Sequence, residues 1–160
     1  MNVKAATLLV LFLAAPAHAA SVGKSRQVEI ALLSEAEWVR PGHPFRVGIH
    51  MKIAPGWHTY WKNPGDAGLP LRLAWTLPEG FSAGPIQWPV PDRIPVPPLM
   101  SYGYSDEVLF PVEITPPASG AHSGSEVTLA VKADWLECKE ACLPAKAVLD
   151  LTLPLKEEDP

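Results

Sequence analysis

The chain has 160 residues, 48% of them apolar, a formal net charge of −4 and two cysteines. This composition excludes a disordered chain, and mild acidity without a basic patch argues against nucleic acid as a partner. Nineteen prolines and eleven glycines work against long helices and favour short strands joined by many turns.

The first residues resemble a secretory signal. Lys4 precedes an apolar run over 5–15, and Ala17-His18-Ala19 fits the small-x-small pattern of a signal-peptidase site. The run is shorter than the ~20 residues that span a bilayer, although an uncleaved membrane anchor is the alternative reading. We therefore expect a signal peptide over 1–19, export to an oxidising compartment, and a soluble mature chain. The family resemblance given below implies that this compartment is the periplasm.

The remainder, about 140 residues, is long enough for one domain with a real core. We expect this domain over 20–155, followed by a frayed charged tail over 156–160. Residues 45–53 alternate strictly between apolar and polar, as a strand with one buried face does. Other strands are predicted at 28–32, 71–75, 108–114, 127–135 and 147–153, with a flexible hairpin loop at 118–125. Turn signals such as Arg40-Pro41-Gly42 separate them, which predicts an all-β, immunoglobulin-like antiparallel β-sandwich.

Cys138 and Cys142 are the two cysteines, with three residues between them. In an oxidising compartment such a pair forms a disulfide unless it is kept reduced. A bond closing so short a loop stabilises a fold by about 2 kcal/mol, against about 4.7 for a loop of 100 residues. The pair therefore suits redox exchange better than architecture, with an inert hairpin disulfide as the alternative.

Two local structures fit the cysteines. A helix over 134–142 would place both thiols on one face, which suits a metal better than a disulfide. The strand-like stretch 127–133 instead predicts a hairpin with Lys139-Glu140-Ala141 at its tip, because residues opposite each other on antiparallel strands lie at a disulfide-compatible spacing. Pro144 limits any helix at its C-terminal end. We prefer the hairpin.

Three segments together resemble the N-terminal periplasmic domain of the thiol:disulfide interchange protein DsbD family, especially its ScsB-like branch. They are Gly56-Trp57-His58-Thr59-Tyr60-Trp61-Lys62-Asn63-Pro64-Gly65-Asp66, then Pro85-Ile86-Gln87-Trp88-Pro89 through to Tyr102-Gly103-Tyr104, and Asp134-Trp135-Leu136-Glu137-Cys138 to Cys142-Leu143-Pro144. The resemblance runs from about residue 28 to 155. Better-studied members space the cysteines by five residues, whereas this chain has three.

The resemblance implies an immunoglobulin-like fold with a redox-active Cys138/Cys142 pair and no cofactor. It implies a component of a protein-disulfide reductase that takes electrons from a membrane-embedded donor. The electrons would pass to periplasmic thioredoxin-fold proteins that isomerise disulfides or serve cytochrome c biogenesis. The sequence ends near residue 160 without the membrane domain or the thioredoxin-like domain of full-length members, so electrons would come from a separate protein, or the gene product is a shortened relative. Cys142 would be the partner-facing sulfur and Cys138 the resolving one.

The resemblance also implies a cap loop over the reduced cysteines, matching about residues 97–105. We expect Met100 and Tyr102 over the sulfurs and Gly103 as a hinge, with Tyr104 also in the loop. Ordinary packing is the alternative, and Ser101 aligns best with the family's shielding aromatic. Residues that match positions beside the cysteine pair, or adjoin it in the chain, are His58, Tyr60 and Trp135.

Rival functions are weighed on the same residues. Two thiolates with His58, His50 or Met100 would suit Cu(I) in a copper-tolerance system. A non-catalytic sandwich is the third reading. The proline-rich run 88–98 is more simply a rigid loop than a polyproline ligand, and the six tryptophans are mainly packing residues.

Overall fold

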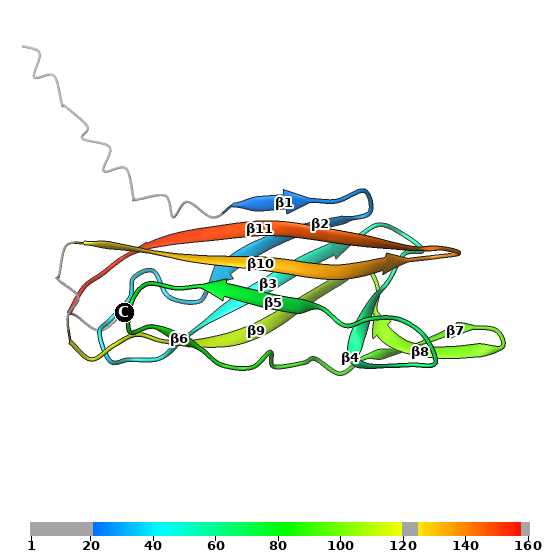
Figure 1. The fold of residues 1–160 in the computed structure, drawn as a ribbon, viewed down its shortest axis with the longest axis horizontal. Helices are drawn as coiled ribbons and strands as arrows, with labels where there is room; N and C mark the ends of the chain where they lie inside the picture. The colour runs from blue at the N-terminus through cyan, green and yellow to red at the C-terminus, as the bar shows by residue number, and fades with distance from the viewer. Residues whose placement is uncertain (1–20, 120–124, 158–160) are drawn as a thin grey trace, which may run out of the picture.

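The structure is a computed structural model that describes residues 21–119 and 125–157. Within these residues the chain forms eleven strands and no helix. Figure 1 shows how the strands are arranged. The strands are β1 (Val22–Lys24), β2 (Val28–Ser34), β3 (Phe45–Ile53), β4 (Thr59–Gly65), β5 (Arg72–Thr76), β6 (Ser82–Ala83), β7 (Asp92–Val96), β8 (Leu99–Tyr104), β9 (Glu107–Thr115), β10 (Glu126–Cys138) and β11 (Cys142–Pro154).

One layer is an antiparallel sheet in the order β1-β2-β3-β9-β6. Strand β3 has the bounds predicted from its alternation, and its odd-numbered side chains are buried. Ile49 at its centre pairs with Leu32 of β2 and Phe110 of β9, all three fully buried. The period-two pattern therefore places one apolar face of this sheet against the core.

The facing layer is a three-stranded sheet in the order β11-β10-β5. Strands β10 and β11 pair without interruption from Glu126↔Pro154 to Cys138↔Cys142. Their inward residues Leu129, Val131, Leu149 and Leu151 join the same core as β3 and β9. The predicted immunoglobulin-like β-sandwich is confirmed, and in Figure 1 strands β5, β10 and β11 overlap strands β2, β3 and β9 of the other layer.

A third sheet, in the order β4-β8-β7, lies at one end of the sandwich. The tip of the β10–β11 hairpin lies at the same end (Figure 1). Strands β7 and β8 form a hairpin whose turn contains a cis Pro97–Pro98 peptide bond. The stretch predicted as a cap loop is therefore mostly strand β8, because its backbone pairs with β4 on one side and β7 on the other.

Some predicted features lie outside the described residues. They are the signal peptide over 1–19, most of the hairpin loop at 118–125, and the last three residues of the tail. Among the described residues, no helix is long and apolar enough to cross a membrane.

Candidate functional site

The candidate site is a disulfide between Cys138 and Cys142 at the tip of the β10–β11 hairpin. The two Cα atoms lie 4.1 Å apart, and Lys139 donates its N–H to the carbonyl of Ala141 to close the turn at 3.2 Å. The predicted hairpin with its tip at 139–141 is confirmed, and the helical alternative is wrong. The strand predicted from 127–133 continues to Cys138, and its pairing with β11 places Cys138 opposite Cys142.

The two cysteines differ sharply in exposure. Cys138 is 1% exposed, whereas Cys142 is exposed at the start of β11. The cause is the segment before β4, since His58 and Cys138 exchange two main-chain hydrogen bonds of 2.9 Å. This bridge covers Cys138 and turns its N–H and C=O away from β11. A partner approaching from solvent therefore meets Cys142.

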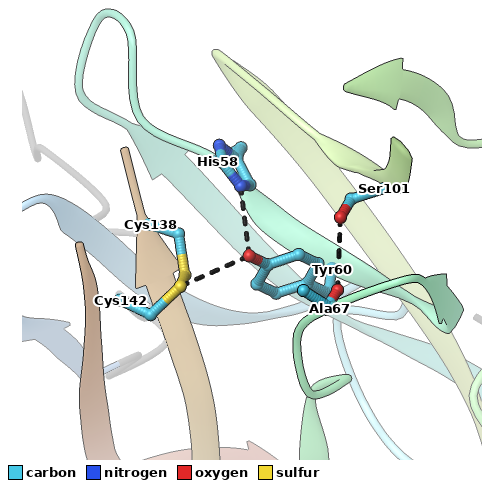
Figure 2. The surroundings of a disulfide bond; sticks show 6 residues. All are labelled: His58, Tyr60, Ala67, Ser101, Cys138 and Cys142. Carbon is cyan, nitrogen blue, oxygen red and sulfur yellow. Dashed lines mark hydrogen bonds between the residues drawn. A yellow bond between two sulfur atoms is a disulfide. The ribbon is translucent and has the colours of Figure 1, made fainter. Parts of the chain in front are cut away.

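A chain of polar contacts leads from Cys142 into the domain (Figure 2). The Tyr60 hydroxyl lies 3.4 Å from Cys142 Sγ, and His58 Nε2 lies 3.3 Å from the same hydroxyl. A disulfide sulfur carries no hydrogen, so the phenol is the donor to sulfur. The imidazole then donates its Nε2–H to the phenol oxygen. The rings of His58 and Tyr60 meet edge to face at 5.2 Å.

Burial determines the protonation states of His58 and Tyr60. Desolvation lowers the pKa of His58 and raises the pKa of Tyr60. At neutral pH the imidazole is therefore uncharged and the phenol keeps its proton. A protonated phenol can stabilise a Cys142 thiolate after reduction, because hydrogen bonds to a charged acceptor are stronger than those to a neutral one.

The loop after β4 holds the Tyr60 ring in place. Gly68 has φ +113°, and a Cβ there would lie 2.3–2.5 Å from three Tyr60 ring carbons. Ser101 donates its hydroxyl to the carbonyl of Ala67 at 3.2 Å (Figure 2). The backbone N–H of Asp66 bonds the carbonyl of Met100 at 3.1 Å, and the Asp66 carboxylate accepts from the Met100 N–H at 2.8 Å. These bonds connect strand β8 to the loop that contacts Tyr60, the residue beside Cys142 Sγ.

The four predicted cap residues all lie in β8. Met100 and Tyr102 are half-buried, and the Tyr102 ring lies against Gly65 at the end of β4. Gly103 is buried where a Cβ would meet the Thr59 carbonyl oxygen at 1.9 Å, so the close pairing of β4 and β8 requires glycine there. The cap role and the hinge role remain predictions.

Tyr104 lies in the sandwich interior. Its ring packs edge to face on Phe110 at 5.1 Å, and its hydroxyl donates to the carbonyl of Pro89 at 2.8 Å. Burial raises the pKa of Tyr104 far above its usual range. Tyr104 therefore anchors the C-terminal end of β8 to the core, and Trp135 is likewise a buried member of that core.

Sequence reasoning missed a buried carboxylate beside the cysteines. Glu137 is 2% exposed, and the Ser25 hydroxyl in the turn between β1 and β2 donates to its Oε2 at 2.5 Å. The chain neighbour of Cys138 is thus bound to a segment more than a hundred residues away. The Glu137 position alone gave no signal, because a charged residue next to a hairpin tip is ordinarily exposed.

Of the three candidate copper ligands, His58 lies beside the disulfide, whereas His50 and Met100 are bonded elsewhere. His50 Nε2 lies 2.6 Å from Glu107 Oε1, in a pair formed between β3 and β9. His58 is bonded to Tyr60, and Met100 is bonded through its backbone to Asp66. Within 21–119 and 125–157, no group of three or more His, Cys, Asp or Glu side chains is arranged to hold a metal.

The fold and this site together define an immunoglobulin-like domain of the thiol–disulfide exchange class. The profile of the family described as thiol:disulfide interchange protein DsbD, N-terminal, matches residues 27–154. The chain belongs to this family, so the resemblance seen in the sequence is confirmed.

Two solved structures are similar to the chain. One is the N-terminal periplasmic domain of ScsB from Proteus mirabilis, with a TM-score of 0.61 and 23% identity over 79% of this chain. The chain spans about half of that relative, 47% of its length, and the likeness shows the fold. The other, the GAE domain of yeast GGA1, has a TM-score of 0.42 and 14% identity over 85% of this chain and 99% of its own. No curated protein sequence matches the chain.

Reduction of Cys138–Cys142 is expected to leave the fold standing. The bond joins residues already paired in a 13-residue ladder, and it closes a very short loop. Its loss should cost about 2 kcal/mol or less, which lowers the melting temperature by no more than about 5–10 °C. Thermal melts with and without reductant measure this, and unfolding on reduction at 25 °C would show a structural disulfide instead.

Removing the Tyr60 hydroxyl is expected to slow alkylation of the reduced Cys142 thiol at neutral pH. Tyr60→Phe keeps the ring but removes the donor, so the pKa of the Cys142 thiol should rise and less thiolate should be present at pH 7. Alkylation of the reduced protein should be about 5–10-fold slower at that pH. The rate above the new pKa should match the wild type, and an unshifted pH profile would mean that Tyr60 does not stabilise the thiolate.

The predicted cap is tested at Tyr102. Tyr102→Ala in the fully reduced protein should speed alkylation of Cys142 by a small reagent, because a half-buried ring would be removed from the end that carries the cysteines. The melting temperature should change little, since Tyr102 is outside the main core. Equal alkylation rates in two equally folded proteins would place the shield elsewhere, with Tyr60 the nearest aromatic side chain.

Proposed function

We propose that this domain relays electrons by thiol–disulfide exchange through Cys138 and Cys142. It would receive them from a membrane-embedded reductase and pass them to periplasmic thioredoxin-fold proteins. The observation that carries the proposal is the unequal exposure of one disulfide, with Cys142 open to a partner and Cys138 covered by His58. Family membership and the ScsB-like fold support it.

The exchange needs two steps. The Cys142 thiolate attacks one sulfur of the partner disulfide, and the partner's other sulfur leaves as a thiolate. Cys138 then attacks Cys142 Sγ, reforms the intramolecular disulfide and releases the partner as a dithiol. Two electrons pass to the partner, and the membrane donor restores the domain by the reverse chemistry.

The side chains around the sulfurs support these steps differently. Tyr60 would stabilise the attacking thiolate through its hydroxyl, while neutral His58 fixes the direction of that hydroxyl. Ladder pairing holds Cys138 opposite Cys142 for the second step. We further propose that residues 1–19 direct export, which would place the domain in the oxidising compartment where this chemistry is useful.

The proposal is tested with the purified domain and a thioredoxin-fold protein in its disulfide form. The reduced domain should convert that protein to its dithiol with equal loss of its own thiols, followed by mass shifts after thiol labelling. Its reduction potential, measured against glutathione, should lie above about −300 mV, since structural disulfides of secreted proteins usually lie below it. A lower potential without transfer to any thioredoxin-fold protein would contradict the proposal.

A further inference from the structure

Strand β11 has an open edge that begins at the exposed cysteine. Backbone groups of alternate strand residues point to opposite sides, so residues of one parity face β10 and the others face away. Cys138 directs its N–H and C=O to His58, away from β11. Its ladder partner Cys142 therefore directs its own groups away from β10, and Pro144 and Lys146 share that direction.

A second observation confirms this parity. Asp150, also even-numbered, accepts a hydrogen bond from the Ser21 N–H at 2.9 Å and donates its own N–H to the Ser21 hydroxyl at 2.6 Å. The N-terminal segment thus occupies the far part of the edge. In the part of the chain that the structure describes, the outward main-chain groups at 142, 144 and 146 have no main-chain partner. They comprise three carbonyls and two N–H groups.

A cavity of about 380 Å³ lies beside this open segment. Its wall is Leu143, Pro144 and Ala145, and Ser25 and Glu137 line it as a hydrogen-bonded pair. Arg26 and Lys146 also line this cavity, and both are exposed cations. The opening between the β1–β2 turn and the edge of β11 therefore has unpaired backbone groups on one side and positive charge nearby.

We propose that the redox partner docks an extended, acidic segment on this edge, adding a short strand along Cys142–Lys146 with its reactive cysteine facing Cys142. This inference rests on the proposed function and names how the partner is held. An added strand forms main-chain hydrogen bonds whatever its sequence, and these bonds provide affinity. The adjacent space for side chains provides selectivity. Pro144 lacks an N–H, which blunts the edge against pairing with a second copy of the domain.

The test uses Cys138→Ala, whose single thiol is Cys142. Four probes carry a 2-thiopyridyl disulfide: a nine-residue peptide with a central cysteine flanked by glutamates, the same peptide N-methylated on alternate amides, its lysine-flanked counterpart, and 2,2′-dithiodipyridine, which has no peptide backbone. The Cys142 thiolate attacks the probe sulfur, forms the mixed disulfide and expels pyridine-2-thiolate, which becomes the absorbing thione. The initial rate of thione release is measured for each probe.

The parent peptide should react about fivefold or more faster than its N-methylated form, since each lost hydrogen bond is worth about that factor. Lys146→Pro removes one outward N–H without touching the β10 ladder, so it should slow the peptide about fivefold and leave dithiodipyridine unchanged. Val148→Pro, of the same parity but two residues farther on, is the matched control and should slow neither probe. Lys146→Gln keeps the N–H and isolates the charge.

The glutamate peptide should also react faster than a lysine-flanked one, and added salt should reduce that difference. Equal rates for the parent and N-methylated peptides would overturn edge docking, and this comparison needs no edge variant to fold. Equal rates for the glutamate and lysine peptides would overturn the acidic partner segment. A Cys142 that reacts with dithiodipyridine but shows no peptide preference refutes docking alone, whereas a Cys142 inert to every probe refutes the proposed exchange function.

Discussion

Cys138→Ala is expected to turn the domain into a trap for its partners. The exposed Cys142 can still attack a partner disulfide, but the thiol that would resolve the mixed disulfide is gone. A stable covalent complex with a thioredoxin-fold protein should therefore accumulate, where the wild type shows almost none. Non-reducing gels and mass mapping of the linked peptides measure its yield and assign its sulfur to Cys142.

The reciprocal variant is the control. Cys142→Ala leaves Cys138, which is 1% exposed and covered by the bridge to His58. It should trap little or no partner, although both variants are expected to keep the fold. Trapping by Cys138 and none by Cys142 would reverse the assigned roles.

Gly68→Ala is expected to have the second large effect, because it acts on the ring beside the sulfur. The added Cβ would overlap three Tyr60 ring carbons, and φ +113° is rarely adopted by an L-residue. The backbone strain alone costs on the order of 1–3 kcal/mol. Tyr60 must move, so the reduced protein should lose hydroxyl donation to Cys142 and its alkylation pH profile should shift upward.

Gly80→Ala is the control that separates the effect of backbone strain from the effect of moving the Tyr60 ring. Gly80 also has a positive φ, +78°, but its Cβ would meet Pro117 at 3.0 Å rather than a residue of the site. It should destabilise the fold by a similar backbone cost while leaving the alkylation profile unchanged. Identical profiles for the wild type and a folded Gly68→Ala protein would show that the ring position is not held by this glycine.

The β-sandwich could be predicted from the alternation of apolar and polar residues and from the turn residues. Strand β3 alternates over nine residues with one fully apolar face, so its bounds and buried side could be predicted without a partner strand. The cysteine hairpin was predictable for a similar reason, since β propensity leads into a three-residue tip. Each of these signals is local, and each agrees with the tertiary packing.

The third sheet was not predictable in the same way. Strand β7 contains Pro95, and β8 contains Ser101 and Gly103, residues that local propensity assigns to loops. They are strands because β4 offers a backbone to pair with, which is a tertiary effect. The Glu137–Ser25 bond is equally non-local, joining positions 112 residues apart that no spacing rule connects.

The two-sided fixing of Cys138 has a consequence for how quickly a partner is released. Its backbone is bonded to His58 on one side, and its strand is paired with β11 on the other. After reduction these bonds remain, so the two thiols cannot drift apart as they would in an open loop. Cys138 therefore attacks a mixed disulfide at Cys142 with a high effective molarity, and near-attack placement of this kind is worth up to ~10⁵–10⁸ M in well-oriented systems. Covalent capture at Cys142 would then be brief, and the lifetime of the encounter would be set by the rest of the binding surface.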